Sequence, residues 1–218
     1  RPGAVPVSLK EEINRTIPVI EAIRKISNIS ISIDTYKSEV AEKALLAGAD
    51  FINDISGFTF DSRMMEIVKK FDVPVVLMHI KGTPQDMQTN PTYIDVIKDL
   101  LEFFSFQINK ALDFGIKKVQ IIIDPGIGFG KQLNDNFILI RRLKEFSELG
   151  FPILIGPSRK SFIGLTLDSP PEYRLEGTLA AVSAGILNGA SIVRVHDVKE
   201  VKRTVIITDK IMGADTQV

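Results

Sequence analysis

The chain has 218 residues, enough for one large domain or two small ones, and 44% of them are hydrophobic. Lys and Arg number 27, and Asp and Glu also number 27, so no net positive field exists to hold nucleic acid and any anion site must be local. Cys is absent, which excludes disulfides, Cys-ligated zinc, iron–sulfur clusters and thiol nucleophiles. No apolar run approaches the roughly 20 residues that span a bilayer. We therefore expect a cytoplasmic protein that binds neither nucleic acid nor a membrane.

Amphipathic helical patterns alternate with short apolar strand patterns along the chain. The first helix follows a capping box at Ser8 and contains Pro18, which predicts a kink or a restart. Strands are expected at 29–33, 51–55, 74–79, 119–124, 152–156 and 191–195. Further helices are expected at 39–47, 62–71, 91–114, 134–149, 172–187 and 198–212. Residues 81–90 are rich in turn formers and predict a long loop that only Met87 anchors.

This alternation predicts a parallel sheet covered by helices. Two architectures are compatible with six strands: a doubly wound open sheet, and a (β/α)₈ TIM barrel of which the chain carries six of eight βα units. Every strand ends in polar or reactive residues. An open sheet takes its site from a few strand ends at one switch point, whereas a barrel gathers all of them in one mouth. The pattern therefore favours a single α/β TIM-barrel domain over residues 1–218.

A basic cluster follows the last two predicted strands. Ser158, Arg159 and Lys160 follow one strand, and Arg194 and His196 follow the next. In barrels the loops after the last two strands often form a phosphate site, and Arg supplies a bidentate fork for such an anion. The alternative is ordinary solvated surface charge. The position of both groups at strand ends favours a phosphate or pyrophosphate site.

Carboxylates and an amide end three other strands. Asp34 and Asp124 each terminate an apolar strand, and Asn53 terminates a third. A half-buried carboxylate can accept a pair of N–H donors from a guanidine-like ring edge. The alternative is a helix cap or a turn, since Asp124 precedes a proline. Asp54, beside Asn53, is expected to be structural.

The glycine-rich segment 126–131 has the look of a nucleotide loop, but its spacing is wrong. A P-loop needs one more residue between its end glycines and a Ser or Thr after the Lys, where Gln132 stands here. We expect a tight turn that lets a ligand approach the backbone, with Phe129 either as a stacking ring or as core packing. His79 has no evident partner and is interpreted as a structural hydrogen bonder.

Seven short motifs, in this order, resemble the dihydropteroate synthase family: Arg1-Pro2-Gly3-Ala4, Ile33-Asp34-Thr35, Ile52-Asn53-Asp54, Leu77-Met78-His79, Asp124-Pro125-Gly126-Ile127-Gly128-Phe129, Ser158-Arg159-Lys160-Ser161 and Arg194-Val195-His196-Asp197. The resemblance implies a TIM barrel that is usually a homodimer. It also implies a folate-biosynthesis transferase that condenses 6-hydroxymethyl-7,8-dihydropterin pyrophosphate with p-aminobenzoate, releasing pyrophosphate and 7,8-dihydropteroate.

The same resemblance assigns residues of this sequence to three subsites. It implies a pterin site made by Asp34, Asn53, Met78, Asp124 and Lys160. It implies a pyrophosphate site made by Arg1, Arg194 and His196. It implies a p-aminobenzoate site, which sulfonamides also occupy, made by Pro2, Phe129, Ser158 and Lys160. Asp34 and Lys160 are the implied catalytic residues.

The family pattern also implies Mg²⁺, held by an Asn that lies outside the printed sequence, so no metal ligand is assigned within it. Arg1-Pro2-Gly3 reads as the tail of a loop, and we expect two further βα units before it. Two rival functions remain open. One is a pterin-binding methyltransferase domain serving a corrinoid protein, which has no pyrophosphate to hold. The other is a non-catalytic barrel kept as a binding or partner subunit.

Overall fold

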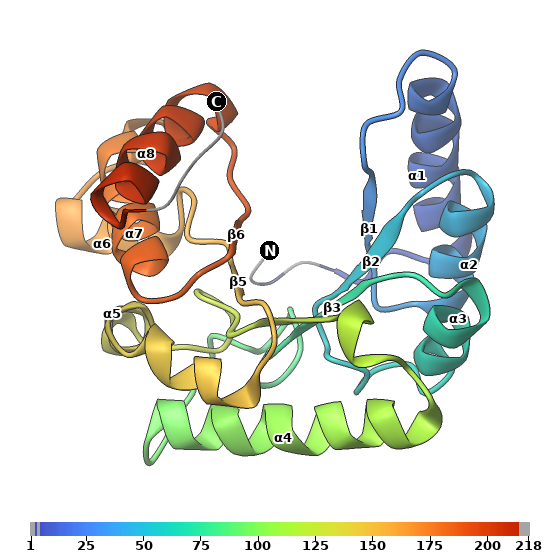
Figure 1. Ribbon diagram of the computed structural model, residues 1–218, viewed down its shortest axis with the longest axis horizontal. Helices are drawn as coiled ribbons and strands as arrows, with labels where there is room; N and C mark the ends of the chain where they lie inside the picture. The colour runs from blue at the N-terminus through green and yellow to red at the C-terminus, as the bar shows by residue number, and fades with distance from the viewer. Residues whose placement is uncertain (1–2, 4, 214–218) are drawn as a thin grey trace.

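The computed structural model describes residue 3 and residues 5–213 of the chain (Figure 1). Four parallel strands pair in chain order: β1 (Ser32–Asp34), β2 (Phe51–Asp54), β3 (Val75–Met78) and β4 (Ile121–Asp124). Two more form a second parallel pair: β5 (Leu154–Ile155) and β6 (Ile192–Val193). A single bridge between Ile123 and Ile153 joins the two sheets. All six expected strands are therefore present, each shorter than its sequence pattern.

Helices lie outside the strands (Figure 1). The α-helices are α1 (Leu9–Arg24), α2 (Ser38–Leu46), α3 (Met64–Phe71), α4 (Val96–Phe114), α5 (Leu133–Arg141), α6 (Ser161–Leu167), α7 (Leu175–Leu187) and α8 (Val198–Ile211). Three 3₁₀ segments complete the set: η1 (Lys118–Gln120), η2 (Leu143–Leu149) and η3 (Pro171–Tyr173). Within the described residues β1 and β6 are not hydrogen-bonded to one another, so the six βα units form an open barrel.

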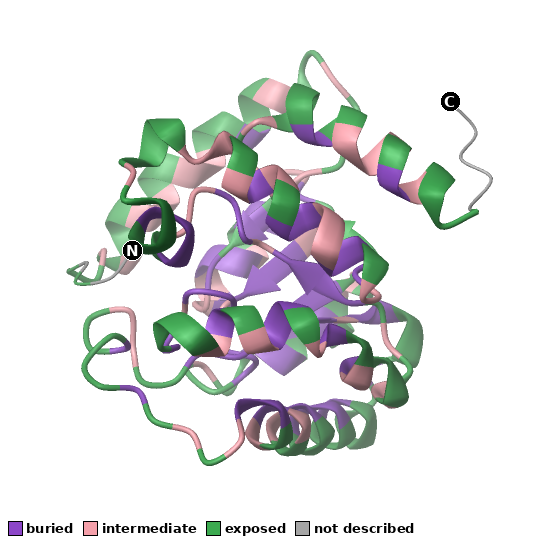
Figure 2. Ribbon diagram, turned by 90° about the vertical axis from the view of Figure 1, so that its left-hand side faces the viewer, coloured by how far each residue is buried: buried purple, intermediate pink, exposed green. Residues whose placement is uncertain are grey.

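The core lies between the strands and the helices that surround them. Figure 2 shows the central strands buried, with helices that alternate between buried and exposed turns. Every residue of β3 is buried, as expected for a parallel strand covered on both faces. In the part of the chain that the structure describes, no helix combines the length and the apolarity that a membrane crossing requires.

The first helix differs from the sequence expectation. Ser8 caps it as predicted, with its Oγ accepting the backbone N–H of Glu11 at 3.2 Å. The restart that Pro18 could have caused is absent, because α1 runs unbroken from Leu9 to Arg24. A proline removes only one intrahelical donor. The apolar face of α1, which includes Ile20, packs into the core and keeps the helix continuous.

Two other helix predictions need correction, and one helix was not predicted. The helix expected at 91–114 begins only at Val96, because Asp95 caps it and accepts the N–H of Ile97 at 3.0 Å. The helix expected at 134–149 ends at Arg141 and continues as 3₁₀ segment η2. Helix α6 was not expected at all. Its seven residues are too few to show a helical period in sequence.

Candidate active site

Strand register brings the predicted polar residues to one end of the barrel. Asp34 of β1 is aligned with Asn53 of β2, and Met78 of β3 is aligned with Asp124 of β4. The backbone N–H of His79 also donates to the carbonyl of Asp124 at 3.0 Å. Because these strands are parallel, their carboxyl ends form a common mouth, as in other barrels. We call Asn53, Met78 and Asp124 the acceptor side of this mouth.

Asp124 is a buried carboxylate with few protein partners. The residue is 6% exposed, and its Oδ1 accepts the backbone N–H of Gly126 at 2.8 Å. Burial raises the pKa of Asp124 to about 6, although the Gly126 N–H and the charges of Lys160, Lys131 and Arg194 act in the opposite direction. Asp124 is thus an acceptor that a ligand with N–H donors would stabilise.

Asn53 carries an oxygen with no hydrogen-bond partner. The residue is 7% exposed, and its buried Oδ1 accepts no hydrogen bond from the described residues. An unsatisfied buried acceptor costs about 1–3 kcal/mol, which is the usual mark of a ligand site or a bound water. Asp54 contrasts with it, because its oxygens accept the N–H groups of Ser56 at 2.8 Å and Phe58 at 2.9 Å. Asp54 is therefore structural, as expected.

Lys160 meets Phe129 across the mouth. The Lys160 ammonium lies 3.8 Å from the centroid of the Phe129 ring, which is cation–π distance. Burial lowers the pKa of Lys160 to about 8; the charge of Arg194 acts in the same direction, and Asp124 and Asp34 oppose it. Lys160 therefore stays a cation at neutral pH, between the carboxylates and the aromatic ring.

Phe129 packs on the protein core as one of its two interpretations predicts, and its role as a stacking ring for a ligand stays a prediction. Its ring stacks against the Lys160 ammonium and also packs on the buried side chains of Met78 and Met87. Met87 comes from the loop 81–90, and it is buried, so this loop forms one wall of the mouth. The neighbouring Gln88 donates to the carbonyl of Gly128 at 2.8 Å. The loop is thus tied to the glycine-rich turn at two places.

The opposite part of the mouth is cationic, and we call Ser158, Arg194 and His196 its cation side. Ser158 Oγ accepts the backbone N–H of His196 at 3.2 Å and lies 2.9 Å from its Nδ1. A hydroxyl that donates to Nδ1 leaves the ring proton on Nε2, free to bind an anion. Arg194 Nη2 lies 2.7 Å from Asp34 Oδ2, with side chains 60% and 44% exposed. This ion pair spans the opening between β6 and β1.

Arg159 does not join the cation side, which corrects the sequence expectation. Its guanidinium forms a two-point ion pair with Asp197, including Nε to Oδ2 at 3.0 Å. Its backbone is left-handed, with φ +56°, and its N–H donates to Thr178 Oγ1 at 3.0 Å. Arg159 therefore fixes the loop after β5 to the loop after β6 and is not available to an anion.

Arg174 is a positioning residue that the sequence did not reveal. Its guanidinium donates to the carbonyls of Ser169 at 2.9 Å and Arg159 at 3.0 Å. It lies flat on α6, where a Cβ on Gly164 would be 2.1 Å from its Nη2. Arg174 thus supports the turn that carries Lys160. It belongs to no strand end and no motif, so nothing in the sequence pattern identified it.

Two residues of the predicted subsites fall outside this geometry. Arg1 and Pro2 lie outside the described residues. No group of three or more His, Cys, Asp or Glu that could hold a metal ion occurs within residues 3 and 5–213.

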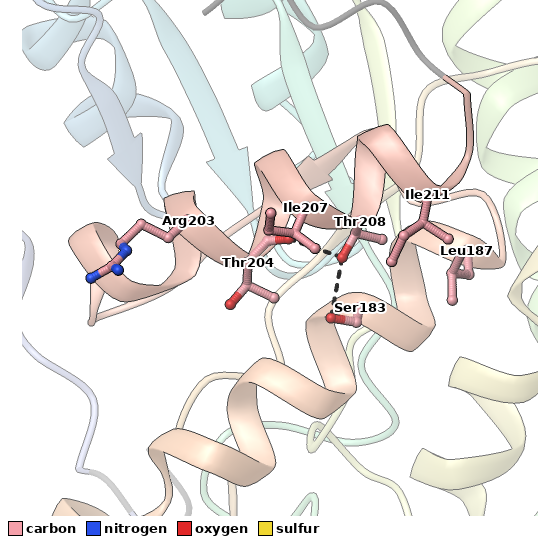
Figure 3. Close-up of a pocket in the computed structure, with 7 residues that line it drawn as sticks. All are labelled: Ser183, Leu187, Arg203, Thr204, Ile207, Thr208 and Ile211. Carbon is pink, nitrogen blue, oxygen red and sulfur yellow. Dashed lines mark hydrogen bonds between the residues drawn. The ribbon is translucent and has the colours of Figure 1, made fainter.

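Two apolar grooves lie on the helices and include no residue from a strand end. One, of about 370 Å³, runs between α7 and α8 and is lined by Leu187, Ile207 and Ile211 among others (Figure 3). The other, of about 420 Å³, lies among α5, α6 and α7 and is lined by Phe137, Phe162 and neighbouring apolar residues. Neither groove includes any of the residues predicted to bind substrate.

Comparison with known proteins identifies the family of this chain. The family described as "Pterin binding enzyme" matches residues 1–196. The dihydropteroate synthase of Synechocystis sp. is 50% identical over 210 residues, covering 96% of this chain and 73% of the relative. That of Bacillus subtilis is 45% identical, covering 98% and 72%. The solved dihydropteroate synthase of Yersinia pestis in complex with a sulfonamide drug has a TM-score of 0.95 at 39% identity, covering 98% and 78%.

The chain belongs to the family of pterin-binding enzymes, whose pattern matches most of its length. Within the family its relatives are dihydropteroate synthases, transferases of folate biosynthesis, and the prediction of that function is confirmed. The prediction of the TIM-barrel fold class is confirmed by the same structures.

Proposed function

We propose that this mouth joins 6-hydroxymethyl-7,8-dihydropterin pyrophosphate to p-aminobenzoate, giving 7,8-dihydropteroate and pyrophosphate. The observation that carries the proposal is the pairing of two unlike sides in one mouth. Asn53 and Asp124 offer buried oxygens, one of them without a partner. Arg194 offers an exposed cation that pairs only at the surface, with Asp34. A pterin ring has donors for the first side, and a pyrophosphate has charge for the second.

The acceptor side binds the pterin. The ring edge of a pterin presents adjacent N–H donors, and a carboxylate that accepts two of them gains a charge-assisted pair. Asp124 takes this role, and Asn53 Oδ1 gains the donor that it lacks. Met78 is buried beside them and supplies an apolar wall. Asp34 lies at the edge of the same site, and Lys160 reaches it from the far side.

The cation side binds the pyrophosphate. Arg194 contributes a fork of N–H donors and His196 contributes Nε2–H, which Ser158 leaves available. Arg1 joins them in the proposal. Mg²⁺ would accompany the pyrophosphate, because this ion binds substrate phosphates and needs few protein ligands.

The p-aminobenzoate lies between Phe129, Ser158 and Lys160, with Pro2 as a further wall. Its ring would stack where Phe129 and Lys160 already meet at 3.8 Å. The C–O bond to pyrophosphate breaks and leaves a pterin methylene cation, which the aromatic amine attacks to form the C–N bond and then loses a proton. Asp34 favours the cation, and the cation side stabilises the departing anion.

A homodimer and a cytoplasmic location complete the proposal. The apolar grooves on α5, α6, α7 and α8 supply a surface that a second copy could cover, since exposed Leu187, Ile207 and Ile211 gather at one of them (Figure 3). Light scattering should give a dimer mass, and Ile207→Asp should give the monomer mass. A monomer before mutation would contradict this part of the proposal.

Binding of inorganic pyrophosphate separates the proposed reaction from a corrinoid methyltransferase, which has no such ligand. Turnover of pterin pyrophosphate with p-aminobenzoate separates it from a non-catalytic barrel. We expect both from the purified enzyme. Pyrophosphate binding without turnover would favour a binding subunit, and absence of both would overturn the proposal.

A further inference from the structure

Lys131 is a buried lysine at the end of the glycine-rich turn. It is 3% exposed, and its ammonium donates to His79 Nδ1 at 3.0 Å, to the Phe129 carbonyl at 2.8 Å and to the Gly126 carbonyl at 3.4 Å. An ammonium has three donors, and here each has an acceptor. Lys131 therefore faces inward to the backbone and ring that surround it. It does not face an anion, as the lysine of a nucleotide loop would.

His79 is the partner that anchors this ammonium to β3. Burial and the charge of Lys131 lower the pKa of His79 to about 2, so the ring is neutral. Its Nδ1 accepts the hydrogen bond from Lys131, which places the ring proton on Nε2. The ring also packs edge-on against Phe103, with centroids 4.8 Å apart. These contacts hold the His79 ring in place, and the ring in turn fixes the position of the Lys131 ammonium.

The glycine-rich turn lies directly on the exit of β3. A Cβ on Gly126 would be 2.0 Å from the His79 carbonyl, and a Cβ on Gly130 would be 2.6 Å from the Lys81 carbonyl. Both glycines have positive φ, +70° and +59°. The turn therefore depends on close backbone contact, and Lys131 is the side chain that ties its two ends to His79.

This turn presents two groups to the mouth. Asp124 stands at its start and accepts the Gly126 N–H, and Phe129 in its middle lies against Lys160. A shift of the turn would move Phe129 away from Lys160 without touching Arg194 or His196. The position of the aromatic wall therefore depends on the bonds that Lys131 makes.

Opposing influences from burial and from neighbouring charges act on the pKa of Lys131. Burial lowers its pKa to about 7, and the cations Lys160 and Lys81 act in the same direction. Asp124 and Asp135 oppose that shift. The neutral groups packed against the ammonium are His79 and Tyr93, whose ring centroid is 5.8 Å away.

We propose that Lys131, braced by His79, is a positioning residue of the synthase: as an ammonium it holds the turn 126–130 so that Phe129 and Lys160 form the p-aminobenzoate site. The inference rests on the function proposed above. On losing a proton the amine keeps only two donors for three acceptors, and the turn loosens. Affinity for p-aminobenzoate should therefore fall as Lys131 deprotonates, while pyrophosphate affinity stays constant.

The test compares Lys131→Met with Lys110→Met, an exposed lysine on α4 that serves as a matched control. Lys131→Met should raise the KM for p-aminobenzoate by about tenfold or more, because the loss removes a charge-assisted set of hydrogen bonds. It should leave the affinity for inorganic pyrophosphate unchanged. Lys110→Met should stay within about twofold of the wild-type KM, as surface substitutions do. Lys131→Gln has two donors and no charge, so its KM for p-aminobenzoate should lie between those of the wild type and Lys131→Met.

Hydrogen exchange and the pH profile distinguish positioning from mere stability. Amides of 126–130 should exchange faster in Lys131→Met, and the wild-type KM for p-aminobenzoate should rise through about pH 7, where the ammonium is lost. Unchanged KM and unchanged exchange in the variant overturn the inference, as does an equal loss of all three ligands. If Lys131→Met fails to fold, a flat wild-type pH profile overturns it. Absence of wild-type turnover would instead defeat the proposed function.

Discussion

The acceptor side and the cation side of the mouth are built in opposite ways. The acceptor side follows β2, β3 and β4, strands of four residues with continuous register, and its polar groups are buried. The cation side follows β5 and β6, strands of two residues each, and Arg194 and His196 are exposed. Buried acceptors have lost their hydrogen bonds to water, and only a ligand with matching donors offsets that free-energy cost. The acceptor side therefore selects the ligand. Exposed cations attract any anion, and salt screens this attraction. The cation side therefore contributes affinity for an anion but little specificity.

The sharpest test of this division measures the affinity of both ligands in a variant of each side. Asp124→Asn should weaken binding of 7,8-dihydropterin by about tenfold to a hundredfold, the scale of a hydrogen bond to a charged group. It should leave inorganic pyrophosphate affinity nearly unchanged. Arg194→Ala should do the reverse. Calorimetry with each ligand alone measures both, and equal losses of both ligands in both variants would show that the mouth is one site.

Lys160 lies where the two sides meet, so its loss should affect turnover more than either affinity. Lys160→Ala should reduce kcat/KM by well over tenfold while the fold survives, since a charge-assisted hydrogen bond contributes about 1.5–3 kcal/mol. Steady-state kinetics, with circular dichroism to check folding, gives the result. Lys202→Ala, an exposed lysine on α8, is the control. Near-normal turnover in Lys160→Ala would remove it from the site.

Burial on the acceptor side should appear as a pH dependence. Asp124 has its pKa raised to about 6, so below that value a proton competes with the pterin for the carboxylate. Pterin affinity should therefore rise about tenfold between about pH 5 and pH 7 and then level off. Asp124→Asn should abolish the rise. A rise of the same size in that variant would assign the titration to another group.

The sequence identified the mouth better than it identified what supports the mouth. Residues at strand ends, such as Asn53 and Asp124, follow from alternation alone, because parallel strands place their carboxyl ends together. Supporting residues carry no such pattern. Lys131 contacts the ring of His79, 52 positions away, and Arg174 donates to the carbonyl of Arg159, 15 positions away. Helix α6 is too short to show a period. Arg159 was misassigned because its partner Asp197 is 38 positions away along the chain.

The smallest effect should come from the contact that joins the two sides across the opening. Arg194 and Asp34 form an exposed ion pair, and such pairs contribute about 0–1 kcal/mol. Asp34→Asn should therefore raise pyrophosphate affinity by less than about fivefold, because Arg194 no longer has a competing carboxylate. Turnover should fall in the same variant, because the proposed role of Asp34 is lost. The gain should shrink as salt is raised, since exposed charges are screened. Titration calorimetry at two salt concentrations measures this. A loss of pyrophosphate affinity would mean instead that Asp34 holds Arg194 in its binding position, and that the cation side is as pre-arranged as the acceptor side.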